Sequence, residues 1–222
     1  MILNFEGQHS GDVIMALPVI TSLRLSGVDV KIYVAEDYRY LLTGLGLEYV
    51  SEPIGPRLST QNITGHATEF WLDYFRVEPV KMDVPTLPAT PTVVLSPDAR
   101  THVRRFPNEF WEAIVWWCSD RNLPVTVIGP KDAVKRNAFL SGPNVTNLTG
   151  EQTIEETYAT LKHALAVVTT DTGTSHLSDA LNDVTVTAFR VNNDEKFAPY
   201  WNRRVVKDLS GAIKHLETLI NK

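Results

Sequence analysis

Residues 165–176, Leu165-Ala-Val-Val-Thr-Thr170-Asp-Thr-Gly-Thr-Ser-His176, decide the fold class of this chain. The apolar, β-branched run Leu165–Thr169 predicts a buried strand, and His176–Leu181 opens a helix soon after it. Small polar residues join the two. Such a junction lies at the carboxyl edge of a parallel sheet, where open α/β folds bind their ligands. We therefore expect an α/β protein with a binding site at this junction.

The same alternation of strand and helix recurs along the chain and favours parallel sheets covered by helices. The pattern predicts strands at Ile2–Phe5, Val28–Val34, Thr92–Ser96, Val125–Ile128 and Val184–Phe189, with a weak strand at Leu47–Val50. It predicts helices over Asp12–Leu25, over residues 64–76, from Pro107, near Asp132–Leu140, after the capping box Thr153–Glu156, and over Leu209–Ile220.

A proline-rich stretch divides the chain. Glu78–Thr92 contains Pro79, Pro85, Pro88 and Pro91, which is incompatible with a helix and typical of an extended linker. We expect two Rossmann-like domains, residues 1–90 and 91–222, facing each other across a cleft. A single doubly wound sheet is the alternative.

The composition limits the classes of partner and compartment. The 222 residues include 21 Lys and Arg against 26 Asp and Glu, a net charge of −5, which disfavours binding to nucleic acid or anionic membranes by bulk charge. No apolar run approaches the roughly 18 residues of a membrane span. The one cysteine, Cys118, lies in an apolar run and is interpreted as a core thiol. We expect a cytoplasmic protein with no stable membrane insertion.

Gly11 and Asp12 break the local pattern at the start of an otherwise apolar helix. Asp12 is favoured there by the helix dipole, and Gly11 makes the turn, which is a purely structural interpretation. The functional interpretation is a carboxylate held at the carboxyl end of the first strand, where ligands bind.

Two loops favour binding of phosphate. Arg104 and Arg105 precede the helix that begins at Pro107, so two guanidinium groups lie beside a helix N-terminus; a solvated basic loop is the alternative. Asp171, Thr172, Gly173 and Thr174 allow close backbone approach to an anion, and His176 follows them. The Asp-Thr-Gly triplet also occurs in aspartic proteases, but their chemistry needs two such carboxylates on an all-β framework.

Other signatures are missing from the sequence. It contains neither a P-loop nor a G-x-G-x-x-G fingerprint, and no Asp-x-Asp pair or His/Cys cluster provides an obvious metal site. Phosphate charge would be handled by arginines, helix dipoles and backbone amides. We therefore expect no bound cofactor and no metal.

Three segments in order resemble glycosyltransferase family 9, the lipopolysaccharide heptosyltransferases of GT-B architecture. They are Ser10–Pro18; Ser96–Ala99 continuing to Arg104–Pro107 and the strand before Gly129; and Asn147–Gly150 with Thr153–Ala164 and Asp171–His176. The resemblance is good over residues 1–50 and 91–190 and poor between 51 and 90.

The resemblance implies an inverting, metal-independent glycosyltransferase that uses a nucleotide-diphosphate sugar, with heptose as one candidate sugar. Asp12 then corresponds to the general base that deprotonates the acceptor hydroxyl. Arg104, where the family usually has lysine, and Arg105 offset the charge of the leaving diphosphate. The residues that would bind the donor's phosphates and sugar are Gly11, Asp171, Thr172, Gly173, Thr174 and His176.

The chain also departs from the family. Asp98 replaces a preferred glycine near the expected path of the diphosphate, and Lys131-Asp132 alters the nucleoside environment. The amino-terminal domain is short, so the acceptor is a saccharide or another hydroxyl compound of unspecified kind. Two alternatives remain: transfer to a hydroxymethylated DNA base, which the net charge disfavours, and a non-catalytic module that binds nucleotide sugars.

Overall fold

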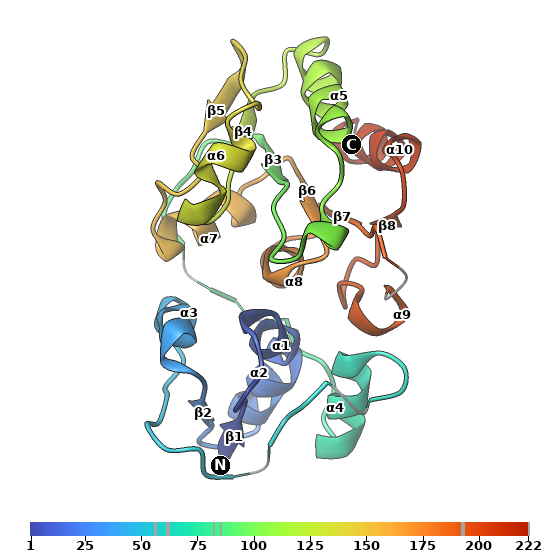
Figure 1. The fold of residues 1–222 in the computed structure, drawn as a ribbon. Coiled ribbons are helices and arrows are strands. Elements are labelled where there is room, and N and C mark those ends of the chain that lie inside the picture. Colours follow the sequence, from blue (N-terminus) through green and yellow to red (C-terminus); the bar gives the residue numbers. More distant parts are fainter. Residues whose placement is uncertain (56, 61–62, 82, 85, 192–193, 222) are drawn as a thin grey trace.

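The computed structural model describes residues 1–55, 57–60, 63–81, 83–84, 86–191 and 194–221. It has an amino-terminal and a carboxyl-terminal unit, each with its own parallel sheet, and Figure 1 shows the amino-terminal unit below the carboxyl-terminal one. The expected α/β class with parallel strands is therefore confirmed. Within the linker, Pro85 lies outside the described residues.

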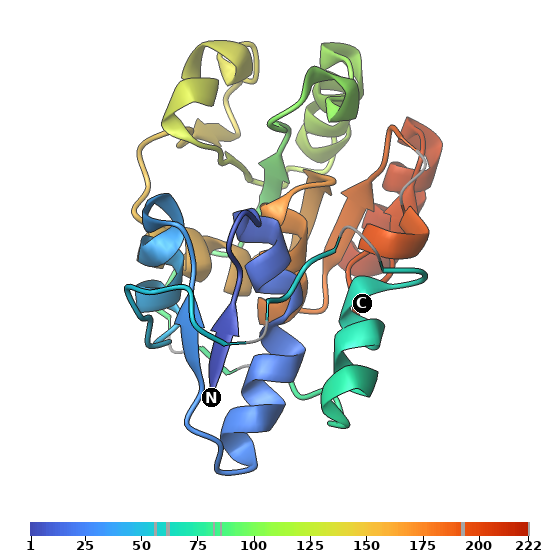
Figure 2. The same ribbon diagram turned by 60° about the horizontal axis from the view of Figure 1, so that its bottom comes forward.

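The amino-terminal unit contains a small parallel sheet, with β1 (Ile2–Asn4) paired to β2 (Lys31–Tyr33). Of the weak strand expected at Leu47–Val50, a single bridge from Tyr49 to Ile32 forms. The unit's helices are α1 (Ser10–Met15), α2 (Leu17–Leu25), the 3₁₀ turn Glu36–Tyr38, α3 (Arg39–Gly44) and α4 (Ala67–Phe75). Helix α2 packs against α4 beside the strands (Figure 2).

The expected helix over Asp12–Leu25 is two helices. It divides at Ala16, which ends α1 and precedes α2, and Pro18 lies in the first turn of α2. Proline lacks an N–H and clashes inside a helix, but the first turn has no intrahelical partner for that N–H. The break leaves α1 as a short separate helix directly after the loop that follows β1.

The carboxyl-terminal unit has a six-stranded sheet of order β5-β4-β3-β6-β7-β8, parallel throughout. Its strands are β3 (Val93–Ser96), β4 (Val125–Val127), β5 (Val145–Asn147), β6 (Ala166–Thr170), β7 (Thr185–Ala188) and β8 (Val205–Val206). The helices are α5 (Asn108–Ser119), α6 (Val134–Asn137), α7 (Ile154–Lys162), α8 (Gly173–Leu181), α9 (Asp194–Phe197) and α10 (Leu209–Ile220), with 3₁₀ turns at His102–Arg104 and Lys131–Ala133.

The order of the strands creates a switch point between β3 and β6. From β3 the chain winds outward through β4 to β5, and from β6 it winds outward the other way. The two carboxyl ends therefore leave a crevice between them, in which doubly wound sheets bind ligands. The strands that sequence reasoning missed, β5 and β8, are the two edges; they are only three and two residues long, too short to show a periodic pattern.

Alternating residues of the central strands enter two separate cores. Val93 and Leu95 face one core, which α5 and α10 cover and which holds the buried Cys118 thiol, as expected. Val94 and Val167 face the other core, which α8 shares with the amino-terminal unit. Because this second core crosses the linker, the two units are fixed against each other by apolar packing, and the domain boundary at residue 90 stays a prediction.

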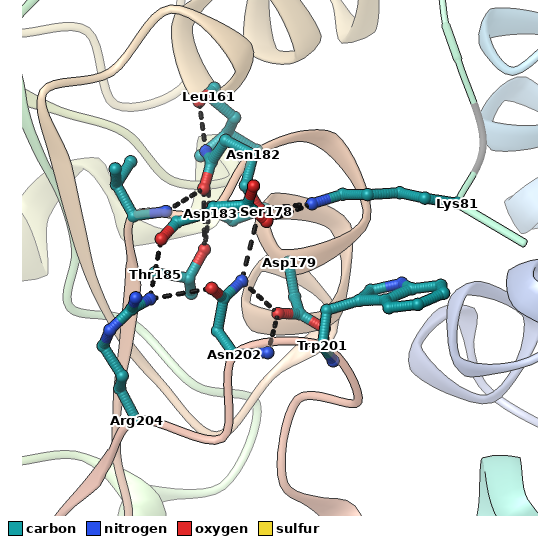
Figure 3. A network of polar contacts seen from close by, with 11 residues as sticks. Lys81, Leu161, Ser178, Asp179, Asn182, Asp183, Thr185, Trp201, Asn202 and Arg204 are labelled. Atoms are coloured by element: carbon teal, nitrogen blue, oxygen red, sulfur yellow. Dashed lines mark hydrogen bonds and ion pairs between the residues drawn. The ribbon is translucent and has the colours of Figure 1, made fainter. Parts of the chain in front are cut away.

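Helix α8 is anchored at its carboxyl end by the polar network of Figure 3. The buried carboxylate of Asp179 accepts hydrogen bonds from the backbone N–H groups of Trp201 at 2.7 Å and Asn202 at 2.8 Å. From the linker, Lys81 donates to the Asn182 carbonyl oxygen at 2.9 Å and pairs with Asp183. The network fixes one end of α8, while the other end faces the amino-terminal unit.

Candidate active site

A cleft of about 810 Å³ opens at the switch point and extends to the amino-terminal unit. One wall comes from the carboxyl ends of β3, β4 and β6 and the starts of α7 and α8, and the other from α1, α3 and the loop before α4. Of the residues that the sequence analysis selected, those lining the cleft are Gly11, Asp12, Arg104, Asp171, Thr172, Gly173, Thr174 and His176. Arg105 does not line it.

Asp12 is the third residue of α1, and both of its carboxylate oxygens have partners. Oδ2 accepts the backbone N–H of His9 at 2.9 Å, and Oδ1 accepts the hydroxyl of Thr60 at 3.0 Å. The structural interpretation of Asp12 as a helix-start residue therefore holds, because the carboxylate caps α1. The same side chain also lines the cleft, so the cap fixes the orientation of a carboxylate that faces the site.

The opposite wall contains the start of α8. Thr172 is the N-cap residue in an extended conformation, and its side chain makes no cap hydrogen bond. The first N–H groups of α8 therefore lack a side-chain acceptor and carry the positive end of the helix dipole. The two walls meet here, because a Cβ atom added to Gly11 would lie 3.7 Å from the Gly173 Cα. The starts of α1 and α8 therefore lie within van der Waals reach of each other.

Asp171 and Arg104 form an ion pair inside the cleft. Arg104 Nη1 lies 3.5 Å from Asp171 Oδ2, an atom that is buried and has no hydrogen-bond partner among the described residues. Burial raises the pKa of the Asp171 carboxyl, and the Arg104 guanidinium opposes the rise. The contact is therefore an ion pair without a well-directed hydrogen bond, and Oδ2 keeps a lone pair that no hydrogen bond among the described residues uses.

His176 is an uncharged imidazole at neutral pH. Burial lowers its pKa to about 3, and electrostatic interactions with His66 and Arg104 act in the same direction. The ring lies one turn into α8 and lines the cleft close to Gly11. A neutral imidazole there can donate or accept a hydrogen bond without adding charge.

The side chain of Arg105 binds the loop after β3 and the Asp98 carboxylate and does not line the cleft. Its Nε donates to the Ala99 carbonyl oxygen at 2.7 Å and lies 3.1 Å from Asp98 Oδ1. The Asp98 carboxylate also accepts two hydrogen bonds from Arg136, both of 2.9 Å. Two guanidinium groups therefore neutralise Asp98, the residue whose charge sequence analysis found unexpected beside a diphosphate.

Sequence reasoning missed several residues that line the cleft. Tyr38 and Tyr40 come from the 3₁₀ turn and α3, Thr60 comes from the poorly patterned region 51–63, and Gln152 and Thr157 flank the start of α7. Only Thr157 lies in a segment that carries the family resemblance, Thr153–Ala164, and nothing in the sequence singles out any of the five as a residue of the site. Only the docking of the two units brings them to one cavity.

A family model for glycosyltransferase family 9 (heptosyltransferase) matches residues 30–217 of the sequence. The chain belongs to glycosyltransferase family 9. The match covers most of its length, including β3, β6 and the start of α8, which form the carboxyl-terminal wall of the cleft. The chain is therefore a glycosyltransferase, as the sequence resemblance implied.

Solved structures share the fold of this family 9 chain at low sequence identity. E. coli ADP-heptose lps heptosyltransferase II is 14% identical with a TM-score of 0.77, and the match covers 99% of this chain and 98% of that one. E. coli heptosyltransferase WaaC with ADP is also 14% identical, with a TM-score of 0.68 and coverage of 98% and 99%. The GT-B type of fold is thereby confirmed. None of the curated proteins matches the sequence significantly.

A third similar structure is described as iron-containing. It is the dodecameric glycosyltransferase TibC from enterotoxigenic E. coli H10407, 14% identical with a TM-score of 0.69; the match covers 92% of this chain and 61% of TibC. In the described part of this family 9 chain, no group of three or more His, Cys, Asp or Glu side chains is arranged to hold a metal ion. In the same residues, no helix is long and apolar enough to cross a membrane.

Proposed function

We propose that this family 9 glycosyltransferase is an inverting, metal-independent enzyme that transfers a sugar from a nucleotide-diphosphate donor to a hydroxyl group. The observation that carries the proposal is the position of Asp12 opposite the Asp171–His176 loop in one cleft. In GT-B terms, residues 1–90 would then bind the acceptor and residues 91–222 the donor. ADP-heptose is the first donor to test, since ADP or ADP-heptose is named for two similar structures.

The donor's charge would be met by the carboxyl-terminal wall. The diphosphate binds the uncapped N–H groups at the start of α8, where the helix dipole favours an anion. Arg104, at the edge of the same loop, offsets the charge that grows on the leaving diphosphate. The Asp171 carboxylate, whose Oδ2 is ion-paired with Arg104 and has no hydrogen bond, would accept one from a sugar hydroxyl once the bound donor opens access to this buried atom, and the neutral His176 adds a second polar contact.

Transfer is a single displacement at the anomeric carbon. The acceptor oxygen forms the new bond to that carbon while the bond from the carbon to the phosphate oxygen breaks. The electron pair of the broken bond goes to the diphosphate, and the acceptor's proton goes to the Asp12 carboxylate. Because attack and departure occur on opposite faces, the configuration inverts. Thr60 and the His9 N–H hold the carboxylate that takes the proton.

The acceptor is proposed to be a saccharide or another small hydroxyl compound. Tyr38 and Tyr40 on the amino-terminal wall offer aromatic faces of the kind that pack on sugar rings. A DNA acceptor has less support, because Arg104 and Arg105 are paired with Asp171 and Asp98 and do not form a free basic patch. The cytoplasmic location expected from the sequence stays a prediction.

A thermal-shift screen with ADP-, UDP-, GDP- and CDP-sugars tests the donor class, because a ligand that binds the folded state raises the melting temperature. The sugar nucleotide that binds is then incubated with Asp12→Asn and with Asp73→Asn, a control that removes the same charge from the exposed face of α4. We expect Asp12→Asn to lose slow donor hydrolysis and keep the thermal shift, and Asp73→Asn to keep both.

Three results would contradict the proposal in different ways. If no sugar nucleotide shifts the melting temperature, the proposed donor site is wrong. If Asp12→Asn hydrolyses the donor as fast as the unaltered protein, Asp12 is not the general base. Binding without hydrolysis by the unaltered protein, under conditions that include candidate acceptors, would favour a non-catalytic module that binds nucleotide sugars.

A further inference from the structure

Two arginines line the cleft, and they differ in their partners. Arg104 faces the Asp171 carboxylate at 3.5 Å. The side chain of Arg100 reaches the His9 ring, with its Nη1 2.9 Å from Nδ1 and 3.1 Å from Nε2, and among the described residues no carboxylate lies within ion-pair distance of it. A neutral imidazole carries one lone pair, so this contact is replaceable by a stronger acceptor.

The other arginines at and beside the cleft are paired with carboxylates. Arg104 balances Asp171, and Arg105 and Arg136 balance Asp98 and Asp132. The Asp12 carboxylate accepts its two hydrogen bonds from neutral groups, the His9 N–H and the Thr60 hydroxyl, so it contributes a negative charge to the cleft. A diphosphate entering this environment can therefore take Arg100 without breaking an ion pair, in addition to the positive charge of Lys207 that already acts on the Asp171 carboxyl, and opposite charges attract strongly in a partly buried site.

The loop after β3 is built to present Arg100. Arg105 Nε donates to the Ala99 carbonyl oxygen at 2.7 Å, and its Nη2 reaches the Arg100 carbonyl oxygen at 3.5 Å. The guanidinium of Arg105 thus holds the backbone on which the side chain of Arg100 crosses the cleft. Arg100 ends at His9, the N-cap of α1, two residues before Gly11 at the contact with Gly173.

We propose that Arg100 is a ligand of the donor diphosphate, exchanging its contact with His9 for the phosphate oxygens. The inference rests on the donor site proposed above and assigns to Arg100 the role that the sequence pattern gave to Arg105. One phosphate lies on the start of α8 beside Arg104, and Arg100 takes oxygens of the same diphosphate from the other side of the cleft. The planar guanidinium suits such bidentate contacts.

The test compares the binding of a nucleoside diphosphate with that of its nucleoside. Calorimetric titration uses ADP and adenosine, or the corresponding pair if the thermal screen selects another base. The proteins are the unaltered chain, Arg100→Ala, Arg100→Lys, and Lys214→Ala, which removes one positive charge from the exposed face of α10. Melting temperatures without ligand report whether each variant is folded.

We expect Arg100→Ala to weaken diphosphate binding by about tenfold to a hundredfold, the range for a charge-assisted hydrogen bond, and to leave nucleoside binding unchanged. Arg100→Lys should retain part of the affinity, because lysine keeps the charge but not the fork. Lys214→Ala should match the unaltered protein.

Two outcomes would overturn the inference and are distinguishable. If the unaltered protein binds the diphosphate and Arg100→Ala binds it equally well, the donor site stands and Arg100 is no part of it. If the unaltered protein binds no nucleoside diphosphate, the proposed donor site fails and the role of Arg100 fails with it.

Discussion

The hydroxyl of Thr60 donates a hydrogen bond of 3.0 Å to Oδ1 of Asp12, joining the loop before α4 to the start of α1. Thr60 is itself nearly buried, so water does not easily replace its hydroxyl. With the His9 N–H on Oδ2, it leaves the carboxylate with a single orientation. In the proposed reaction this orientation directs the proton acceptor at the acceptor hydroxyl.

Replacing Thr60 by valine removes the hydroxyl and keeps the shape of the side chain. We expect kcat for transfer or donor hydrolysis to fall roughly tenfold, because the base loses its alignment, while the affinity for the donor stays the same. Steady-state kinetics and calorimetry measure the two effects. Thr60→Ser keeps the hydroxyl and should retain most of the rate. Equal rates for the valine and serine variants would show that the hydrogen bond does not matter.

Replacing Arg136 by methionine should weaken nucleotide binding although Arg136 does not line the cleft. Asp98 would lose two hydrogen bonds of 2.9 Å, and its nearly buried carboxylate would be left with Arg105 alone. We expect a loss of stability of about 1–3 kcal/mol in urea denaturation and a weaker affinity for ADP. Lys135→Met, one residue earlier in α6 and exposed, is the control. ADP affinity equal to that of the control would argue against any influence of the Asp98 charge.

Gly44 lies at the end of α3 under the ring of Tyr158, which joins the two units by donating to the Leu41 carbonyl oxygen at 3.0 Å. A Cβ atom at position 44 would lie 2.8 Å from Tyr158 Cε2, closer than packing allows. Gly44→Ala should therefore destabilise the protein by about 1–3 kcal/mol, although alanine normally stabilises a helix.

A double-mutant cycle isolates the contact between Gly44 and Tyr158. In a Tyr158→Ala background the clash with the ring is gone while the contact with Ile154 Cγ2 at 3.2 Å remains, so Gly44→Ala should destabilise the protein much less in urea denaturation. Destabilisation of the same size in both backgrounds would mean that the ring of Tyr158 is not the cause.

His176 should make stability depend on pH. Its pKa is lowered to about 3 in the folded state, while the unfolded chain takes up a proton near pH 6.5. Between these values the unfolded state binds more protons, so stability falls as the pH falls below 6.5. At pH 5 the loss from this residue is about 2 kcal/mol relative to high pH.

Urea denaturation at pH 7.5 and pH 5 compares the unaltered protein with His176→Gln. On going from pH 7.5 to pH 5, the free energy of unfolding of His176→Gln should fall by about 2 kcal/mol less than that of the unaltered protein. Asp171 and Asp179, whose carboxyl pKa values are raised by burial, contribute to both proteins and cancel in the comparison. His163→Gln, at an exposed position, serves as the control. A pH dependence unchanged by His176→Gln would mean that the imidazole is not held neutral by the fold.

Local patterns were sufficient for much of the fold. The β-branched run before Asp171 predicted β6 to within one residue, at Ala166–Thr170, and the helix after it was also predicted, although α8 begins at Gly173 and not at the expected His176. The same patterns failed at Pro18, where one expected helix is two, and at the short edge strands β5 and β8. Edge strands of two or three residues are set by pairing with a neighbour, so their own sequence carries little information.

The sequence by itself determined the parallel α/β class, the family and the position of the polar loop after β6, because strand and helix periodicity and glycine turns act over a few neighbouring residues. The tertiary structure decided which side chains share the cleft. The path of the loop backbone directs Arg105 to Ala99 and Asp98, and Arg104 to Asp171. It directs Arg100 across the cleft to His9. Those partners come from distant segments, and adjacent residues of the same type differ in role only once the chain has folded.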